Sequence, residues 1–396
     1  MAAGSAKRSR GGGTEGSPNV VGDRLSALPD CLLHEIMSYL KARQVVQTCV
    51  LSKWWTHLWR SVPCLGLNVH DTELRGTAAV GDHVDNFANF VDNLLLFHDA
   101  PTLDAFRLRF DGAGTWGRSR DADRWIRRAI KYGPSVLEVC FGVQFSNKVQ
   151  IPGLGTCSRR LKRLHLSGVS LDASFAPQIQ SGCPVLEDLE LKSCCCKFRE
   201  ITSRTLKILK LDGCYIGIPV LDDRDGFMVI TVPALVSLHL VVCSFQFSVN
   251  EATNLVQASI GDAKDYCMGI RIKRNLPKLL DGLSSVKNLM LTSLETMVLE
   301  DMSEKFPAFN NLKTLFLHTC KLGNQTLGHF LNRDDRLSAL PDALLHSIMV
   351  SLPARQAVQT CVLSRNGSSP QASCCCAARR EREPVPQAAA SWLSTG

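Results

Sequence analysis

The residues most able to do chemistry in this 396-residue chain are its 17 cysteines and 10 histidines. Three cysteines are adjacent, at Cys194, Cys195 and Cys196. A zinc site needs ligands in converging pairs such as C-x2-C, and the sequence contains no such set of pairs. A reactive thiol needs a neighbouring base, and no cysteine here has a recognisable one. The pattern therefore favours structural cysteines over catalytic or metal-binding ones.

The short signatures of common enzyme classes do not occur either. The chain has no phosphate-binding G-x-x-x-x-G-K-[ST] loop, no H-E-x-x-H and no G-x-S-x-G. The paired acids Asp222-Asp223 and Asp334-Asp335 lie beside turn-like sequence, where such pairs are common. We expect no enzymatic activity and no cofactor.

The middle of the chain repeats the pattern L-x-x-L-x-L at intervals of about 20 to 30 residues, a signature of leucine-rich repeats. Each such unit lays one short strand beside the next, so the pattern predicts an α/β solenoid of short parallel strands with helical or irregular returns. The clear units begin at Leu161, Leu186, Leu206, Leu235, Val286 and Leu312, a degenerate unit begins at Leu255, and two weaker ones begin at Leu103 and Val136.

Within a unit, the alternation of strand side chains separates core from surface. Leu186, Leu189 and Leu191 should point into the solenoid, while Asp188 and Glu190 face outward on the concave sheet. The repeat takes Asn or Cys where the chain turns inward, eight residues after its first leucine. This place is occupied by Cys194, Cys214, Cys243 and Cys320.

A solenoid of unequal units is typically a recognition surface. Its outward side chains lean basic, with an acidic group at Glu187, Asp188 and Glu190, which favours an acidic or phosphorylated partner; the alternative is a face that is simply solvated. The expected outward residues are Lys162, Arg163, His165, Asp188, Glu190, Lys207, Lys210, His239, Lys287, Lys313 and Phe316.

Residues 23–53 read as short helices. Pro29 and Asp30 predict a helix start, with Asp30 as its cap, and apolar residues then recur at helical spacing from Leu32 to Leu40. A second helix is expected over residues 44–49, and a third after a cap at Ser52. So small a unit cannot enclose a self-sufficient core, and it carries more apolar residues than it can bury, so it should pack against something else.

These residues resemble a known family. Leu28-Pro29-Asp30-x-Leu32-Leu33-x-x-Ile36, followed by Thr48-Cys49-Val50-Leu51-Ser52-Lys53-x-Trp55-x-x-Leu58-Trp59, is similar to the F-box of plant leucine-rich-repeat F-box proteins. One departure is Trp54, where the family usually has a basic residue. The alternative is a plain helical subdomain.

The resemblance implies docking onto a Skp-type adaptor, which bridges to a cullin scaffold and a RING protein in an SCF ubiquitin ligase. Carried over by position, the adaptor-binding surface comprises Leu28, Pro29, Leu32, Ile36, Leu40, Val50, Leu51 and Trp55. The chain would then be a non-catalytic substrate receptor, with its repeats binding a protein target that the sequence does not identify. Two rival functions are a repeat scaffold that assembles no ligase, and a nucleic-acid binder.

The block 23–53 returns near the end of the chain as 335–365, with most positions identical. The second copy has no counterpart of Trp55, Leu58 or Trp59, because after Arg365 the sequence turns into Asn366, Gly367 and a tail of Cys, Arg and Ala. We interpret it as a partial second F-box, left by fusion of a neighbouring gene and followed by a tail from a shifted frame or unspliced intron.

Composition limits the setting of the protein. The formal net charge of +8 is mild, and the basic residues are dispersed, so we expect no nucleic-acid partner. No run of about 20 apolar residues occurs, so no membrane span is expected. The start of the chain lacks the apolar core of a secretory signal, and the odd number of cysteines fits a reducing compartment, which together favour cytoplasm or nucleus.

These patterns predict five parts of the chain. We expect a disordered tail at 1–19, an F-box at 20–62, a leucine-rich-repeat domain at 63–332, a partial second F-box at 333–365 and a disordered tail at 366–396. The F-box and the solenoid should move nearly as one body if the junction from Trp59 to Leu67 packs.

Overall fold

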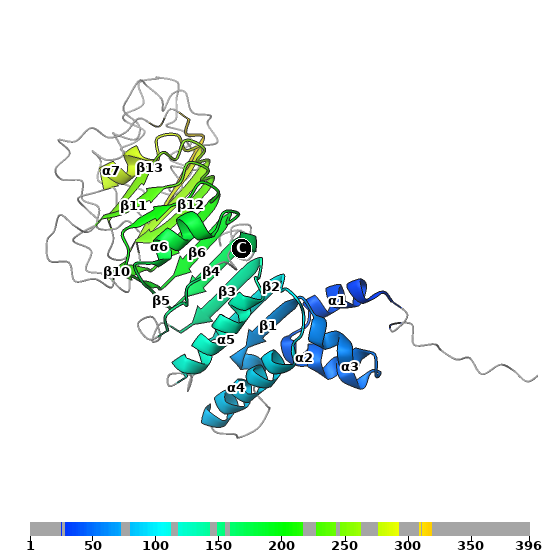
Figure 1. Cartoon of the computed structure of the whole chain (residues 1–396). Coiled ribbons are helices and arrows are strands. Elements are labelled where there is room, and N and C mark those ends of the chain that lie inside the picture. The colour runs from blue at the N-terminus through cyan, green and yellow to red at the C-terminus, as the bar shows by residue number, and fades with distance from the viewer. Residues whose placement is uncertain are drawn as a thin grey trace, which may run out of the picture.

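A computed structural model of the chain describes a helical N-terminal module joined to a long parallel sheet (Figure 1). The described residues are 25, 28–72, 80–111, 118–142, 149–154, 159–216, 227–242, 246–262, 276–292, 309 and 311–318. The second copy of the helical block, at 335–365, and both predicted tails lie outside them.

Ten strands form the main sheet, and every neighbouring pair in it is parallel. The order follows the chain, as a repeat solenoid requires. The strands are β1 (Cys64–Asn68), β2 (Ala105–Phe110), β3 (Val136–Phe141), β4 (Arg163–Ser167), β6 (Asp188–Lys192), β9 (Ile208–Asp212), β12 (Ser237–Val242), β14 (Gln257–Asp262), β15 (Asn288–Thr292) and β16 (Thr314–His318). The predicted α/β class and solenoid are confirmed, including the degenerate unit that begins at Leu255.

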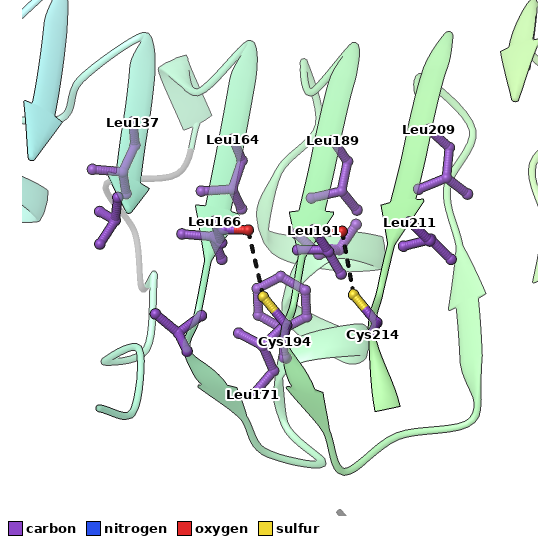
Figure 2. Close-up of a cluster of buried hydrophobic side chains, with 14 of the residues drawn as sticks. Leu137, Leu164, Leu166, Leu171, Leu189, Leu191, Cys194, Leu209, Leu211 and Cys214 are labelled. Carbon is purple, nitrogen blue, oxygen red and sulfur yellow. Dashed lines mark hydrogen bonds between the residues drawn. The ribbon is translucent and has the colours of Figure 1, made fainter. Parts of the chain in front are cut away.

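The leucines of successive units stack in register on one face of the sheet. Leu164, Leu189 and Leu209 pair across β4, β6 and β9, and none of the three is measurably exposed. Figure 2 shows this row together with the parallel row through Leu166, Leu191 and Leu211. The inward orientation predicted from strand alternation is confirmed, and these rows form the centre of the hydrophobic core.

Two turn cysteines each hold the end of their own strand against the preceding one. The Cys194 thiol donates to the carbonyl oxygen of Leu166 at 3.4 Å, and the Cys214 thiol donates to that of Leu191 at 3.2 Å (Figure 2). Burial helps to raise the pKa of the Cys194 thiol well above its usual value, so it stays protonated. The predicted structural role is confirmed for these two residues; Cys243 and Cys320 lie outside the described residues.

Two long helices cover the leucine face beside the first strands, and the sequence analysis had assigned neither. They are α4 (Val80–Phe97) and α5 (Ser119–Lys131), which lie along β1 to β3 in Figure 1. Phe87 of α4 and Trp125 of α5 meet Phe110 of β2, with ring centroids 5.5 to 5.9 Å apart. The first units therefore return through helices, which bury more apolar surface than an irregular return does.

Later units return mostly through very short elements. Two small three-stranded parallel sheets form among these returns, one from β5, β7 and β10 and one from β8, β11 and β13. The return elements are β5 (Ser170–Leu171), α6 (Phe175–Pro177), the π-helical turn η7 (Gln178–Gly182), β7 (Cys195–Cys196), β8 (Glu200–Thr202), β10 (Tyr215–Ile216), β11 (Phe227–Thr231), β13 (Gln246–Asn250) and α7 (Leu276–Asp281).

The N-terminal module is built from short helices around a small core of its own. The buried side chains of that core are Leu33, Met37, Val45, Trp55, Leu58 and Val62. Its elements are α1 (Asp30–Ser38), α2 (Ala42–Gln47), the 3-10 turn η1 (Thr48–Val50), α3 (Trp55–Leu58) and the 3-10 turn η2 (Trp59–Ser61); a further 3-10 turn, η3 (Val69–Thr72), follows β1.

The predicted helix starts are wrong in detail. Pro29 occupies the N-cap of α1 in an extended conformation, and Asp30 is already the first helical residue. The carbonyl of Pro29 accepts from the amides of Leu32 and Leu33, so the proline itself starts the helix. The second helix begins at Ala42 rather than Gln44, and the N-cap of the third falls on Trp54 rather than Ser52.

The junction between module and solenoid packs, as expected. Trp59 contacts the cores of both parts, and Ala42 of α2 is buried in the core of the solenoid. The amide of Asp99 donates to the carbonyl of Arg60 at 2.9 Å, and that of Asp104 donates to the carbonyl of Pro63 at 2.7 Å. His98, only 3% exposed, donates through Nε2 to the carbonyl of Val62 at 2.9 Å.

The first prediction tests the leucine core. Leu189→Ala removes a fully buried side chain from a closely packed row and should lower the free energy of unfolding by about 2–5 kcal/mol. Glu190→Ala, the next residue along and on the opposite face, should lower it by less than about 1 kcal/mol, because its contact with Lys210 is solvent-exposed. Urea unfolding followed by circular dichroism measures both. Equal losses would contradict the inward stacking.

The second prediction concerns pH. Burial, and to a lesser degree the positive charge of Arg128, lowers the pKa of His98 despite the Val62 carbonyl and the charge of Asp99. The unfolded chain therefore binds a proton at a pH where the folded chain does not, so this stability is present above about pH 6.5 and is lost as pH falls below it. Thermal unfolding between pH 7.5 and 5.5 should show a smaller fall in Tm for His98→Gln than for wild type. An unchanged slope would show that His98 does not contribute.

Candidate partner-docking face of the helical module

Helix α1 divides its apolar residues between two faces. Leu33 and Met37 are four residues apart, point into the core of the module and are not measurably exposed. Leu32 and Ile36 have the same spacing on the other side of the helix and are 44% and 45% exposed. The core is complete without this second pair, so α1 presents an apolar stripe to the outside.

A second apolar group lies at the corner formed by η1. Val50 is 83% exposed, and Leu51, immediately after the turn, is 54% exposed. Thr48–Val50 is a single tight turn between α2 and α3. Among the described residues, the side chains that fill the core of the module come from other elements, so Val50 and Leu51 are left on the outside. Exposed large apolar residues at two places of one small unit are typical of a protein-binding surface.

The eight residues predicted for adaptor binding fall into three groups. Pro29, Leu32 and Ile36 are exposed along α1, and Val50 and Leu51 are exposed at the η1 corner. The remaining three face the core of the module: Leu28 and Leu40 pack against it and are half-buried, and Trp55 is 3% exposed within it. Trp55 therefore supports the docking face from behind and is not part of its surface.

The sequence analysis missed two exposed apolar side chains of the module. Tyr39 is 82% exposed and Leu25 is 51% exposed. Tyr39 follows Ile36 by three residues, so the helical spacing that placed Leu32 and Ile36 together could have found it. Trp54, which departs from the family pattern, is 53% exposed.

The imidazole of His34 has a structural use. His34 Nε2 lies 3.2 Å from the carbonyl oxygen of Leu58 and 3.2 Å from Ser61 Oγ. This contact links the middle of α1 to the end of α3, so it fixes the angle at which the apolar stripe of α1 is presented.

The second candidate surface is the face of the sheet opposite the leucines, which we call the open face. All the side chains expected to point outward there, from Lys162 to Phe316, are at least partly exposed. Arg163 and His165 lie 3.1 and 3.2 Å from the carboxylate of Asp188. Burial alone would raise the pKa of Asp188, but His165 and the charge of Arg163 hold it below its usual value. Because its outward side chains are at least partly exposed, the open face is accessible to a partner.

Among the described residues, no group of three or more His, Cys, Asp or Glu side chains converges as metal ligands would. The described helices also include none with the length and hydropathy needed to cross a bilayer.

Comparison with known proteins identifies the module and the chain. The F-box domain model matches residues 25–65, which are the short helices and the start of β1. The rice protein named meiotic F-box protein MOF is 35% identical over 332 residues, which cover 76% of this chain and 66% of that protein. An Arabidopsis F-box/FBD/LRR-repeat protein is 31% identical, over 74% of this chain and 71% of its own length.

The chain therefore belongs to the plant F-box/FBD/LRR-repeat proteins. F-box/LRR-repeat protein 13 of Arabidopsis is 27% identical, over 74% of this chain and 70% of its own length. Its name gives the same two parts, an F-box and leucine-rich repeats. Such proteins are typically non-catalytic adaptors, and membership supports a substrate-adaptor role in general. The F-box match falls on the first copy of the repeated block; the second copy stays a prediction.

The two faces of α1 give a third prediction. Leu33→Ala should destabilise the protein by about 2–5 kcal/mol, because it opens a cavity in the small core. Leu32→Ala, the adjacent residue on the exposed stripe, should change stability by less than about 0.5 kcal/mol. The matched pair is compared by thermal and urea unfolding. A large loss from Leu32→Ala would mean that the stripe is needed by the fold itself and is not available to a partner.

Proposed function

We propose that this chain is the substrate-recognition subunit of an SCF-type E3 ubiquitin ligase. Its F-box docks a Skp-type adaptor, which connects it to a cullin scaffold and a RING protein, and its leucine-rich repeats bind the protein to be modified. The chain itself performs no catalysis. We place it in the cytoplasm or the nucleus, which the nine free thiols among its described cysteines support.

The observation that carries the proposal is the exposed apolar side chains of Leu32, Ile36, Val50 and Leu51 on a module whose core is filled by other side chains. When several large apolar side chains are exposed on so small a unit, they typically mark a surface that a partner covers. F-box domains generally bind Skp1-type adaptors, so the family supplies a partner for the surface that the geometry leaves open.

The contribution of this chain to the reaction is placement. A target lysine must reach the ubiquitin carried by the partner enzyme, and holding the two together replaces a collision by an effectively intramolecular encounter. The packed junction at Trp59 and His98 supports this, because it holds the adaptor-binding module in a fixed orientation to the repeats.

An alternative is a leucine-rich-repeat interaction scaffold that assembles no ligase. Such a scaffold would also bind its partner through the open face of the sheet, but it would not need the exposed residues of α1 and η1 for binding. Adaptor binding therefore separates the two functions.

The fourth prediction is measured by titrating the full chain with a purified plant Skp-type adaptor. Wild type should bind, and Ile36→Asp/Val50→Asp should weaken binding by at least about 100-fold, since each change puts a charge into a desolvated apolar contact. The matched control is Leu96→Asp on α4, an apolar residue that is 62% exposed and lies outside the module. It should bind as wild type does.

All variants are first checked for wild-type thermal unfolding, so that loss of binding is not loss of fold. Failure of the folded wild type to bind the adaptor would reject the ligase function and leave the scaffold. Equal binding by the double variant and the wild type would reject the proposed face.

A further inference from the structure

The charges on the open face of the sheet are largely neutralised over its first two thirds. From β2 to β9, cations on or beside the strands contact acids on neighbouring positions, and such pairs leave little net attraction for a charged partner. The pairs and their N to O distances are Arg107–Glu138 at 3.1 Å, Arg109–Asp111 at 3.2 Å, Arg163–Asp188 at 3.1 Å, Lys192–Asp212 at 3.3 Å, Lys207–Glu187 at 2.9 Å and Lys210–Glu190 at 3.2 Å.

The last two strands differ. Lys287 and Lys313 stand side by side just before β15 and β16, where the amide of Lys313 donates to the carbonyl of Lys287 at 2.7 Å. Both side chains are exposed, and within the described part of the chain neither makes an ion pair. The two positive charges are therefore directed at solvent.

Two large apolar side chains lie on the same strands. Met290 and Phe316 are register partners across β15 and β16, and they are 40% and 42% exposed. Each follows its lysine by three residues, which at about 3.3 Å per residue separates the apolar pair from the charges by about 10 Å. The equivalent positions on β6 and β9 are the paired Glu190 and Lys210.

We propose that Lys287, Lys313, Met290 and Phe316, together the β15–β16 patch, bind the target of this protein through a segment that presents an apolar side chain beside carboxylates or phosphates. This deepens the proposed function, since it names the chemistry of the target that the repeats would hold. The occupant is a protein segment, because its apolar and anionic groups must be about 10 Å apart, which is the reach of three to four extended residues.

The two lysines determine which charge the bound segment must carry. A segment rich in Lys or Arg would meet two uncompensated cations, while an acidic or phosphorylated one would pair with them and gain steering at low salt. The apolar pair adds the area that a charged contact alone lacks, since exposed ion pairs contribute little by themselves. Both elements are needed for a specific site.

The experiment begins with random twelve-residue peptides displayed on phage and selected on the full chain. Enriched peptides should carry Asp or Glu within about four residues of Leu, Ile, Met or Phe. One enriched peptide is then synthesised with a fluorophore, in its acidic form and with phosphoserine replacing the acids, and the Kd of each is measured by fluorescence polarisation at two salt concentrations.

Variants of the patch are compared with a matched control. Lys287→Ala/Lys313→Ala should weaken peptide binding about three- to tenfold and reduce its salt dependence, and Met290→Ser/Phe316→Ser should weaken it at least about tenfold. The control Lys192→Ala/Lys210→Ala also removes two lysines from the open face, but paired ones, and should leave the Kd within about twofold. The phosphorylated form binding more tightly than the acidic form would identify phosphate as the natural anion, and the reverse would identify carboxylate.

Enrichment of basic peptides, absence of any enrichment, or binding that neither patch variant weakens would overturn the proposal. The same preparations are titrated with the Skp-type adaptor. Because the patch variants leave α1 and η1 intact, they should bind the adaptor as wild type does, so failure of the patch and failure of the ligase function give different results.

Discussion

The inward alternation of leucines along ten parallel strands is the constraint on which the other features of this molecule depend. It commits every second strand residue to the core and so leaves the remaining residues on one open face, in rows that run across the sheet. It also sets the turn chemistry, because the thiols of Cys194 and Cys214 close each turn by bonding to the carbonyl of the preceding strand. Recognition residues are thus placed by packing, at positions where their identity is free to vary.

The F-box module uses this solenoid as the rest of its core. Its own buried residues are few, and Ala42 and Trp59 extend the packing into the first repeat unit. With its interior completed in this way, the module can leave Leu32, Ile36 and Val50 on its surface. The apolar excess that the sequence shows is therefore divided between a shared core and an outward face.

The sequence predicted the strands well, because the repeat pattern follows from short-range periodicity. The outward residues of α1 were expected from the resemblance to the F-box, since helical spacing alone puts Leu32 and Ile36 in one apolar series with the buried Leu33 and Met37. The sequence predicted helical or irregular returns but did not assign α5, although Trp125, Ile126 and Ala129 have helical spacing. It placed Trp55 on the adaptor-binding surface because the resemblance carried the residue over by position, and a position in a motif does not show which side of a four-residue helix faces the core. Most of the ion pairs on β2 to β9 join residues 20 to 31 positions apart, and only the strand register brings these together.

Because the strands follow the chain in parallel register, the number of repeat units sets the length of the solenoid. Neighbouring strands lie about 4.8 Å apart, and the F-box is fixed to the first of them, while Lys287 and Lys313 directly precede the ninth and tenth. Loss or gain of one unit between β4 and β12 would change the span between the two ends by one strand spacing without altering either end. The length over which a bound protein is held from the adaptor can thus evolve in discrete steps, separately from what is bound.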